Sequence, residues 1–327
     1  MKKSDMDEIL NLTPENYFTE EEQSSLDEQT EEYVKKCKEK SYKPTHRVCQ
    51  QKIDSESALS AYVCLNENIP LAPISKSLQN AIDTLDSEFP WFSKANQEIH
   101  RQLNARQQSS TAVFKIRPLL LAGNPGVGKT SWVKRVAELF GIPLDLIMAA
   151  GGHDTMHLKG SARGWANSQP GEVARMIASE KIANPIFLVD EIDKSAKNSQ
   201  HGSILDSLLQ LIEPATSKNY IDECLRVSCD FSYVSWIATC NSLFNLPKPL
   251  LDRFTIIYVD KPGPEHTSAI VKSAIRFFAA DLDIDERMLP KLDGQELKAL
   301  EGLTPRAISS VVRRMMENKL SVKPEYH

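Results

Sequence analysis

Eight residues near the middle of the chain have types and spacing suited to holding phosphate groups. They read Gly123-Asn124-Pro125-Gly126-Val127-Gly128-Lys129-Thr130, which matches G-x-x-x-x-G-K-[ST]. Glycines at these positions let backbone N–H groups curve around an anion, and the helix expected from Ser131 adds partial positive charge at its start. Lys129 would reach the β- and γ-phosphates of a nucleotide, and Thr130 would hold Mg²⁺. The expected binding segment therefore runs from Gly123 to Ser131, with ATP and Mg²⁺ as ligands.

Two carboxylates follow an apolar run about sixty residues later, at Asp190 and Glu191. Carboxylates at the end of a buried strand are costly unless something compensates their charge. A magnesium ion would compensate the first, so Asp190 is the expected second metal ligand. Glu191 would then orient and polarise the water that attacks the γ-phosphate. The alternative is a strand that simply ends at a polar surface.

A third apolar run, from Ser235 to Cys240, ends at Asn241. Its amide could hydrogen-bond the γ-phosphate or the attacking water, because it offers both a donor and an acceptor without charge. Taken alone, an asparagine at this place is more often a turn residue.

These three sites require strands that end at one edge of a sheet. Short apolar runs alternate with helix-length stretches at 117–122, 143–148, 185–189, 234–239 and 254–259. That alternation predicts an α/β fold in which a parallel sheet of about five strands has helices on both faces. The nucleotide motif then lies between a strand and a helix over 131–140, as its mechanism requires.

The regions on either side of this sheet have a different pattern. Residues 1–55 are acidic and poor in large apolar side chains, which favours a solvated, disordered tail or short helices. Residues 56–112 form an expected helical extension, since Ile74, Leu78, Ile82 and Leu85 share one helix face. A sheet domain is expected over 113–262. Residues 263–327 are expected to form a small helical domain with helices at 268–280 and 304–319. Ile308, Val311, Val312 and Met315 are expected to face inward in the second of these helices.

Composition limits the class of protein. The chain has 327 residues, 41% of them hydrophobic and 25% charged, which is ordinary for a globular protein. No apolar run approaches the ~20 residues of a membrane span, and the N-terminus has no secretory pattern, so a cytoplasmic location is expected. The six cysteines show no metal-binding spacing. A net charge of −5 leaves nucleic-acid binding possible but unsupported.

Together these motifs resemble the AAA+ superfamily, and within it the ATPase module of the Lon proteases. The resemblance covers about residues 113–320 and depends on four stretches, which are 126–131, 184–194, 236–241 and Pro249-Leu250-Leu251-Asp252-Arg253-Phe254. It implies a P-loop AAA+ sheet, a helical lid and hydrolysis of ATP. The chain ends at His327, after the last expected lid helix, where the Lon proteases continue into a peptidase. An ATPase without proteolytic activity is therefore expected.

The resemblance also implies roles for two arginines. Arg253 matches the arginine finger, which reaches the ATP of an adjacent subunit, although a salt bridge with Asp252 or another local acid is the alternative. Arg306 matches the second sensor of the lid. In support, Thr304 is a good N-cap and Pro305 suits the first helical position, which places Arg306 in the first turn. A cation there is unfavourable unless an anion lies opposite, and ATP would be that anion. Arg313 and Arg314 fall later in that helix.

The stretch from Gly160 to Gly171 is similar to the Lon segment that bears an aromatic pore loop. Trp165 stands at the aromatic position, where the family usually has tyrosine. It could project into a central channel and press on an extended chain, or it could be a core residue.

Three functions follow from these expectations. The first is a homo-oligomeric ring, with a hexamer as the expected form, that remodels or unfolds a protein partner. The second is a nucleic-acid motor or loader, and the third is a switch whose assembly is controlled by nucleotide. The same fold hosts many functions, so the choice depends on analogy.

Overall fold

The computed structural model describes residues 44–53, 59–74, 77–109, 111–149, 156–162, 168–195 and 204–321. Within these ranges, no helix is both long and apolar enough to cross a membrane. The expected tail over 1–55 and the candidate pore residue Trp165 lie largely or wholly outside them.

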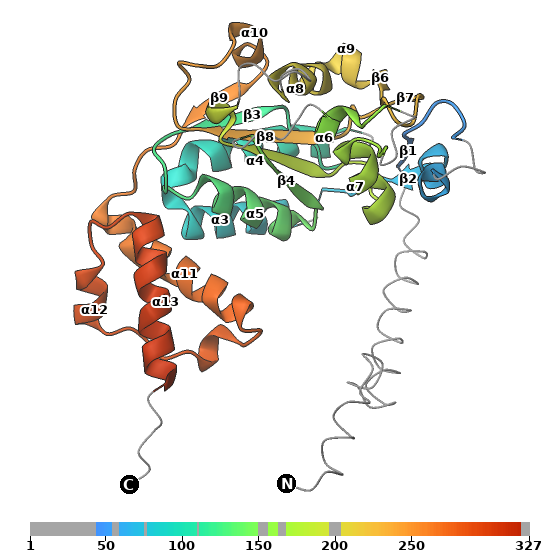
Figure 1. Cartoon of the computed structure of the whole chain (residues 1–327). Helices are drawn as coiled ribbons and strands as arrows, with labels where there is room; N and C mark the ends of the chain where they lie inside the picture. Colours follow the sequence, from blue (N-terminus) through green and yellow to red (C-terminus); the bar gives the residue numbers. More distant parts are fainter. Residues whose placement is uncertain are drawn as a thin grey trace, which may run out of the picture. The chain divides into compact units, whose positions relative to one another are not determined.

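The centre of the protein is a parallel sheet of five strands (Figure 1). Its order is β4-β5-β8-β3-β9, and the strands are β3 (Leu119–Ala122), β4 (Leu144–Met148), β5 (Ile186–Asp190), β8 (Ser235–Cys240) and β9 (Thr255–Tyr258). The ends of each strand lie within one residue of the ends of an apolar run in the sequence, except that β3 begins two residues later than its run. The expected α/β fold with a parallel sheet is confirmed.

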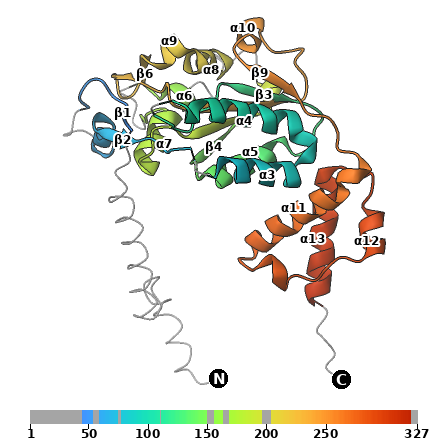
Figure 2. The ribbon, with the colours of Figure 1, turned by 180° about the vertical axis from the view of Figure 1, so that it is seen from behind.

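The three central strands, β5, β8 and β3, are buried on both faces, which explains why they read as continuous apolar runs. Along β5, Phe187 packs on one face and Leu188 on the other, because successive side chains of a strand point in opposite directions. Helices α7 (Glu172–Glu180) and α8 (Ile204–Ile212) cover the first face. Helices α3 (Leu78–Glu88), α4 (Ser93–Gln107) and α5 (Lys129–Phe140) cover the second (Figure 2).

Glycine and proline set the helix boundaries that matter for the site. Helix α5 begins after Gly128 and ends before Gly141, and both glycines have positive φ, at 101° and 61°. The helical extension expected over 56–112 contains two α-helices, α3 and α4, which are separated near Pro90. Pro90 starts the short 3-10 helix η3 (Pro90–Phe92) between α3 and α4, because proline disfavours helical backbone in the residue before it.

The rest of the described chain adds two small sheets and short helices. Strands β1 (Thr45–Arg47) and β2 (Asn68–Pro70) pair antiparallel, as do β6 (Tyr220–Ile221) and β7 (Ser228–Cys229). The shorter helices near the sheet are η2 (Ser60–Asn66), α6 (Met156–Lys159), η4 (Ile192–Lys194), α9 (Pro214–Ser217) and α10 (Lys248–Leu251).

A helical lid follows β9. It consists of η5 (Pro264–His266), α11 (Thr267–Asp281), η6 (Glu286–Met288), α12 (Gly294–Ala299) and α13 (Pro305–Ser321). Ile308 and Val312 of α13 are buried as expected, but the third buried position is Met316 rather than Met315. The inward placement of Val311 was wrong, since 36% of its side chain is exposed. The fully buried positions of α13 therefore recur every four residues, at Ile308, Val312 and Met316.

Candidate functional site

The loop between β3 and α5 has the backbone that the phosphate motif predicts. Gly126 and Gly128 have φ angles of 79° and 101°, which side chains other than glycine rarely adopt. Gly123 serves a different purpose, because a Cβ atom there would lie 2.4 Å from the carbonyl oxygen of Val259. The first glycine of the motif thus allows the end of β9 to approach, and the other two shape the turn.

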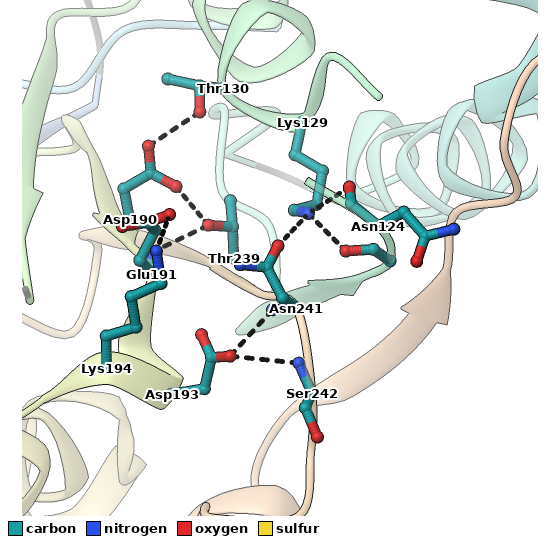
Figure 3. A network of polar contacts seen from close by, with 11 residues as sticks. Asn124, Lys129, Thr130, Asp190, Glu191, Asp193, Lys194, Thr239, Asn241 and Ser242 are labelled. Atoms are coloured by element: carbon teal, nitrogen blue, oxygen red, sulfur yellow. Dashed lines mark hydrogen bonds and ion pairs between the residues drawn. The ribbon is translucent and has the colours of Figure 1, made fainter. Parts of the chain in front are cut away.

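The ammonium of Lys129 lies among three oxygen acceptors. Its Nζ donates to the carbonyl of Gly123 at 2.6 Å, to the carbonyl of Asn124 at 3.1 Å and to Oδ1 of Asn241 at 3.1 Å (Figure 3). Only 8% of Lys129 is exposed, and this burial lowers the pKa of its ammonium despite nearby carboxylates. The loop and β8 therefore position one cation at the carboxyl edge of the sheet.

The two carboxylates after the second motif strand occupy different environments. Asp190 accepts a hydrogen bond from Oγ1 of Thr130 at 2.8 Å, and its other oxygen accepts from Oγ1 of Thr239. Glu191 has a left-handed backbone with φ of 55°, an uncommon conformation for a non-glycine residue. Its carboxylate pairs with Lys194 at 2.7 Å and stays partly exposed. The turn thus directs Asp190 at the phosphate loop and leaves Glu191 open to solvent.

Asn241 is held by a carboxylate that sequence reasoning did not single out. Oδ2 of Asp193 accepts from the backbone N–H of Asn241 at 3.2 Å and of Ser242 at 3.1 Å. Thr239 was missed as well, although its hydroxyl contacts Asp190 and accepts from the N–H of Glu191 at 3.0 Å. Asp193 follows the carboxylate pair by two residues and Thr239 precedes Asn241 by two, so both could have been found by spacing.

These side chains line one cavity of about 420 Å³. Its walls come from the phosphate loop, the ends of β5 and β8, and the start of the lid helix α13. The lining residues are Pro125, Gly126, Gly128, Lys129, Thr130, Ser131, Asp190, Glu191, Lys194, Thr239, Asn241, Pro305, Arg306 and Ser309. Most of the expected site residues therefore meet in one place, although the lining residues span 185 positions of sequence from Pro125 to Ser309.

Arg306 reaches this cavity from the lid. The hydroxyl of Thr304 accepts from the N–H of Ala307 at 3.3 Å, so the expected N-cap is present. A Cβ atom on Gly126 would lie 3.5 Å from Cβ of Arg306. Arg313, by contrast, pairs with Asp281 at 2.9 Å within the lid. The first turn of α13 faces the phosphate loop.

Arg253 does not line the cavity. Its Nε lies 2.5 Å from Oε2 of Glu213, and its Nη1 donates to the carbonyl of Pro249 at 2.8 Å. A local acid does hold this arginine, and that acid is Glu213 rather than Asp252. About a third of the Arg253 side chain remains exposed, at 36%.

The ends of the candidate pore segment are described, but its centre is not. Ser161 and Gln169 bond across the segment, with the N–H of Ser161 donating to the carbonyl of Gln169 at 2.9 Å. The buried carboxylate of Asp222 accepts from the N–H of Gly171 at 2.7 Å. Burial raises the pKa of Asp222, although backbone N–H donors partly offset this effect. Trp165 and Arg163 lie outside the described residues.

Comparison with known proteins identifies the region that contains this cavity. Residues 119–261 match the AAA family, described as the ATPase family associated with various cellular activities. The match begins at β3 and ends just after β9, so it includes the phosphate loop and both motif strands. This chain carries an AAA+ ATPase domain.

The AAA+ domain resembles the ATPase module of the Lon proteases. The Lon protease of Clostridioides difficile (strain 630) is 30% identical over 252 residues, covering 73% of this chain and 32% of the relative. That of Mycoplasma genitalium is 31% identical over 263 residues, covering 79% and 31%. That of Rickettsia bellii is 36% identical over 182 residues, covering 55% and 23%. The chain thus spans about a third or less of these curated relatives.

A solved structure has the same fold. It is a closed-state cryo-EM reconstruction of Hsp104 with ATPγS and FITC casein, matched with a TM-score of 0.59. The match covers 76% of this chain and 48% of that chain at 17% sequence identity. At that identity the similarity concerns the fold alone.

Proposed function

We propose that this protein hydrolyses ATP in the cavity between its AAA+ domain and lid, and that a ring of identical subunits uses the energy to remodel a protein partner. The observation that carries the proposal is the convergence of a phosphate loop, two carboxylates, an asparagine and a lid arginine on one cavity. Family membership supports nucleotide binding independently of that geometry.

Each residue of the cavity has a role suited to its chemistry. Lys129 would contact the β- and γ-phosphates, since its ammonium already lies at the mouth of the phosphate loop. Glu191 would accept a proton from the attacking water as the bond between the γ-phosphorus and ADP breaks. Asn241 would orient that water, and Arg306 would stabilise the charge that develops on the γ-phosphate.

The cavity also fits a magnesium ion. Thr130 and Asp190 provide a hydroxyl and a carboxylate that lie 2.8 Å apart, and hard oxygen ligands are those that Mg²⁺ prefers. When bound with ATP, the ion would neutralise phosphate charge. Thr239 would keep the Asp190 carboxylate in place by its own hydrogen bond.

The position of Arg253 is the basis on which we propose a ring. This arginine lies outside its own cavity and is paired with Glu213, so it has no catalytic role there. In an assembly it would leave Glu213 and reach the γ-phosphate bound by the adjacent subunit, as an arginine finger. The alternative role, a local salt bridge, would leave hydrolysis independent of neighbours.

A protein is the class of partner that the relatives favour. The Lon relatives are named as proteases, and the Hsp104 structure was solved with casein. Proteolysis is not part of the proposal, because the described residues form an ATPase domain, its lid and an N-terminal extension. A nucleic-acid partner is the competing function, and it would leave the ATP site unchanged.

The test is the steady-state ATPase rate of the full chain under three conditions. These are addition of unfolded casein, addition of single-stranded DNA, and buffer alone. We expect unfolded casein to raise the rate about tenfold and DNA to leave it unchanged. Stimulation by DNA alone would replace the protein partner with nucleic acid, and stimulation by neither would favour the assembly switch. The Glu191→Gln variant controls for contaminating ATPases, since it should show no rate under any condition.

A further inference from the structure

The N-terminal extension contacts both the phosphate-loop helix and the lid through one carboxylate. Glu88 is the last residue of α3, and it accepts hydrogen bonds from Nε and Nη2 of Arg135, each at 2.8 Å. The guanidinium of Arg276 pairs with the same carboxylate. Arg135 belongs to α5, which begins at Lys129, and Arg276 belongs to α11, the first long helix of the lid. Glu88 therefore joins three elements that are distant in sequence.

This ion network is shielded from solvent. The side chains of Glu88, Arg135 and Arg276 are only 14%, 12% and 18% exposed. Burial raises the pKa of Glu88, but hydrogen bonds from Arg135 and Arg276 outweigh it and hold the pKa below its ordinary value. A shielded pair responds to loss of one partner more strongly than an exposed pair does, because the remaining charge is left unpaired.

A second contact of the same segment repeats this arrangement three residues later. The indole Nε1 of Trp91 donates to the carbonyl of Val127, inside the phosphate loop, at 2.9 Å. The Trp91 ring lies 5.8 Å from the ring of His266, the residue before α11. Trp91 also packs against the cores of both the sheet domain and the lid. The segment therefore contacts both the phosphate-loop region and the lid at two different points.

We propose that Glu88 and Trp91 form a lid brace, which sets where the lid lies over the phosphate loop and so where Arg306 meets the γ-phosphate. Both are positioning residues, because they line no part of the cavity and act through α11 and the phosphate loop. The lid brace acts on the proposed ATP site, so this inference rests on the proposed function. Its consequence is that the extension before the AAA+ domain tunes discrimination between ATP and ADP.

The chain offers a matched control for Glu88. Glu98 of α4 is 15% exposed and pairs with Arg101 at 2.6 Å and Arg117 at 3.4 Å. Burial raises its pKa, and hydrogen bonds from Arg101 and Gln102 outweigh it, as for Glu88. The named partners of Glu98 all lie outside the lid. Glu98→Gln thus removes a carboxylate of similar exposure that also pairs with two arginines, both of which lie outside the lid and are 62% exposed.

The experiment measures the dissociation constants of ATPγS and ADP by calorimetry. We expect Glu88→Gln to lower the preference for ATPγS over ADP about fivefold, while Glu98→Gln leaves it unchanged. Arg276→Gln should reproduce the loss, and it carries the test if Glu88→Gln does not fold. Circular dichroism melts of each variant show whether the fold is retained.

A double-mutant cycle with Arg306 separates positioning from general stability. If the brace acts by placing Arg306, then adding Glu88→Gln or Arg276→Gln to Arg306→Gln should lower the preference no further. Additive losses, or an equal loss in Glu98→Gln, would overturn the brace. If the parent chain fails to bind ATPγS, the proposed function fails. If the parent binds but Glu88→Gln and Arg276→Gln match it, the brace alone fails.

Discussion

The hydroxyl of Thr130 donates a 2.8 Å hydrogen bond to the carboxylate of Asp190, sixty positions later in the chain. This contact joins the phosphate loop, which follows β3, to the end of β5, although β3 and β5 are not adjacent in the sheet. Strand β8 lies between them, and its Thr239 bonds the other oxygen of Asp190. The start of α5 and strand β8 therefore fix the carboxylate at the end of β5.

Asp193 provides a test of how Asn241 is positioned. Replacing it with alanine removes the acceptor for the N–H groups of Asn241 and Ser242. We expect Asp193→Ala to lower kcat about tenfold with little change in KM, because the lost bonds orient an amide needed mainly in the transition state. Steady-state kinetics measure both constants. A kcat equal to that of the parent would mean that the loop after β8 holds Asn241 without Asp193.

Arg253 can be tested by mixing two inactive variants. If it acts on the ATP of a neighbour, Arg253→Ala and Glu191→Gln are each inactive alone. Mixed oligomers would contain some intact sites, with Glu191 from one subunit and Arg253 from the next. An equal mixture should restore activity at about a quarter of its interfaces. If the mixture stays inactive while light scattering shows mixed oligomers, the finger role is excluded and the Glu213 salt bridge remains.

Light scattering also tests assembly itself. The Glu191→Gln variant with saturating ATP should form a homo-oligomer, with a hexamer as the expected size, because nucleotide would lie between subunits. A monomer at every concentration would contradict the ring.

Trp165 tests whether the protein threads its partner. If it lines a channel, Trp165→Ala should keep nucleotide binding and assembly but lose partner processing. A core tryptophan would instead cost roughly 3 to 5 kcal/mol of stability on removal. A melting temperature lowered by well over ~5 °C, with all activities reduced together, would show that Trp165 is structural.

Glu88 gives the stability a predictable dependence on pH. Its pKa in the folded protein lies below the ordinary value of 4.5, so the carboxylate contributes stability above that pH. The contribution disappears as the pH falls through the lower folded-state pKa. We expect the melting temperatures of the parent and Glu88→Gln to differ most at pH 7 and to converge below pH 4.5. A difference that is constant across this range would contradict the ion network.

The sheet was predictable because its three central strands are buried on both faces, so each is a continuous apolar run between polar stretches. The same burial hides which strands are neighbours, and the order β4-β5-β8-β3-β9 needed the structure. The motif residues could be placed because each follows a strand directly. Thr239 and Asp193 lie two residues from motif positions, and that spacing was the only signal for them in the sequence. Thr239 contacts the Asp190 side chain and Asp193 accepts from the backbone N–H of Asn241, each more than forty positions away.

Two features of the helical regions were missed for local reasons. The break at Pro90 could have been expected from the proline, but the apolar spacing continues through it. Helix α12 is short, yet Asp293 and Glu296 form a capping box that marks its start in the sequence. The pairing of Glu88 with Arg135 and Arg276 has no signal in a single sequence, since it joins residues 47 and 188 positions apart.

The most direct test of the central claim compares Lys129→Ala with Glu191→Gln in a titration with ATP and an assay of its hydrolysis. The account predicts that Lys129→Ala loses nucleotide binding, because its ammonium holds phosphate. Glu191→Gln should bind ATP as the parent does and lose turnover, because only activation of water is removed. Equal ATP affinity in Lys129→Ala and the parent, or full turnover in Glu191→Gln, would contradict the assignment of this cavity as the ATPase site.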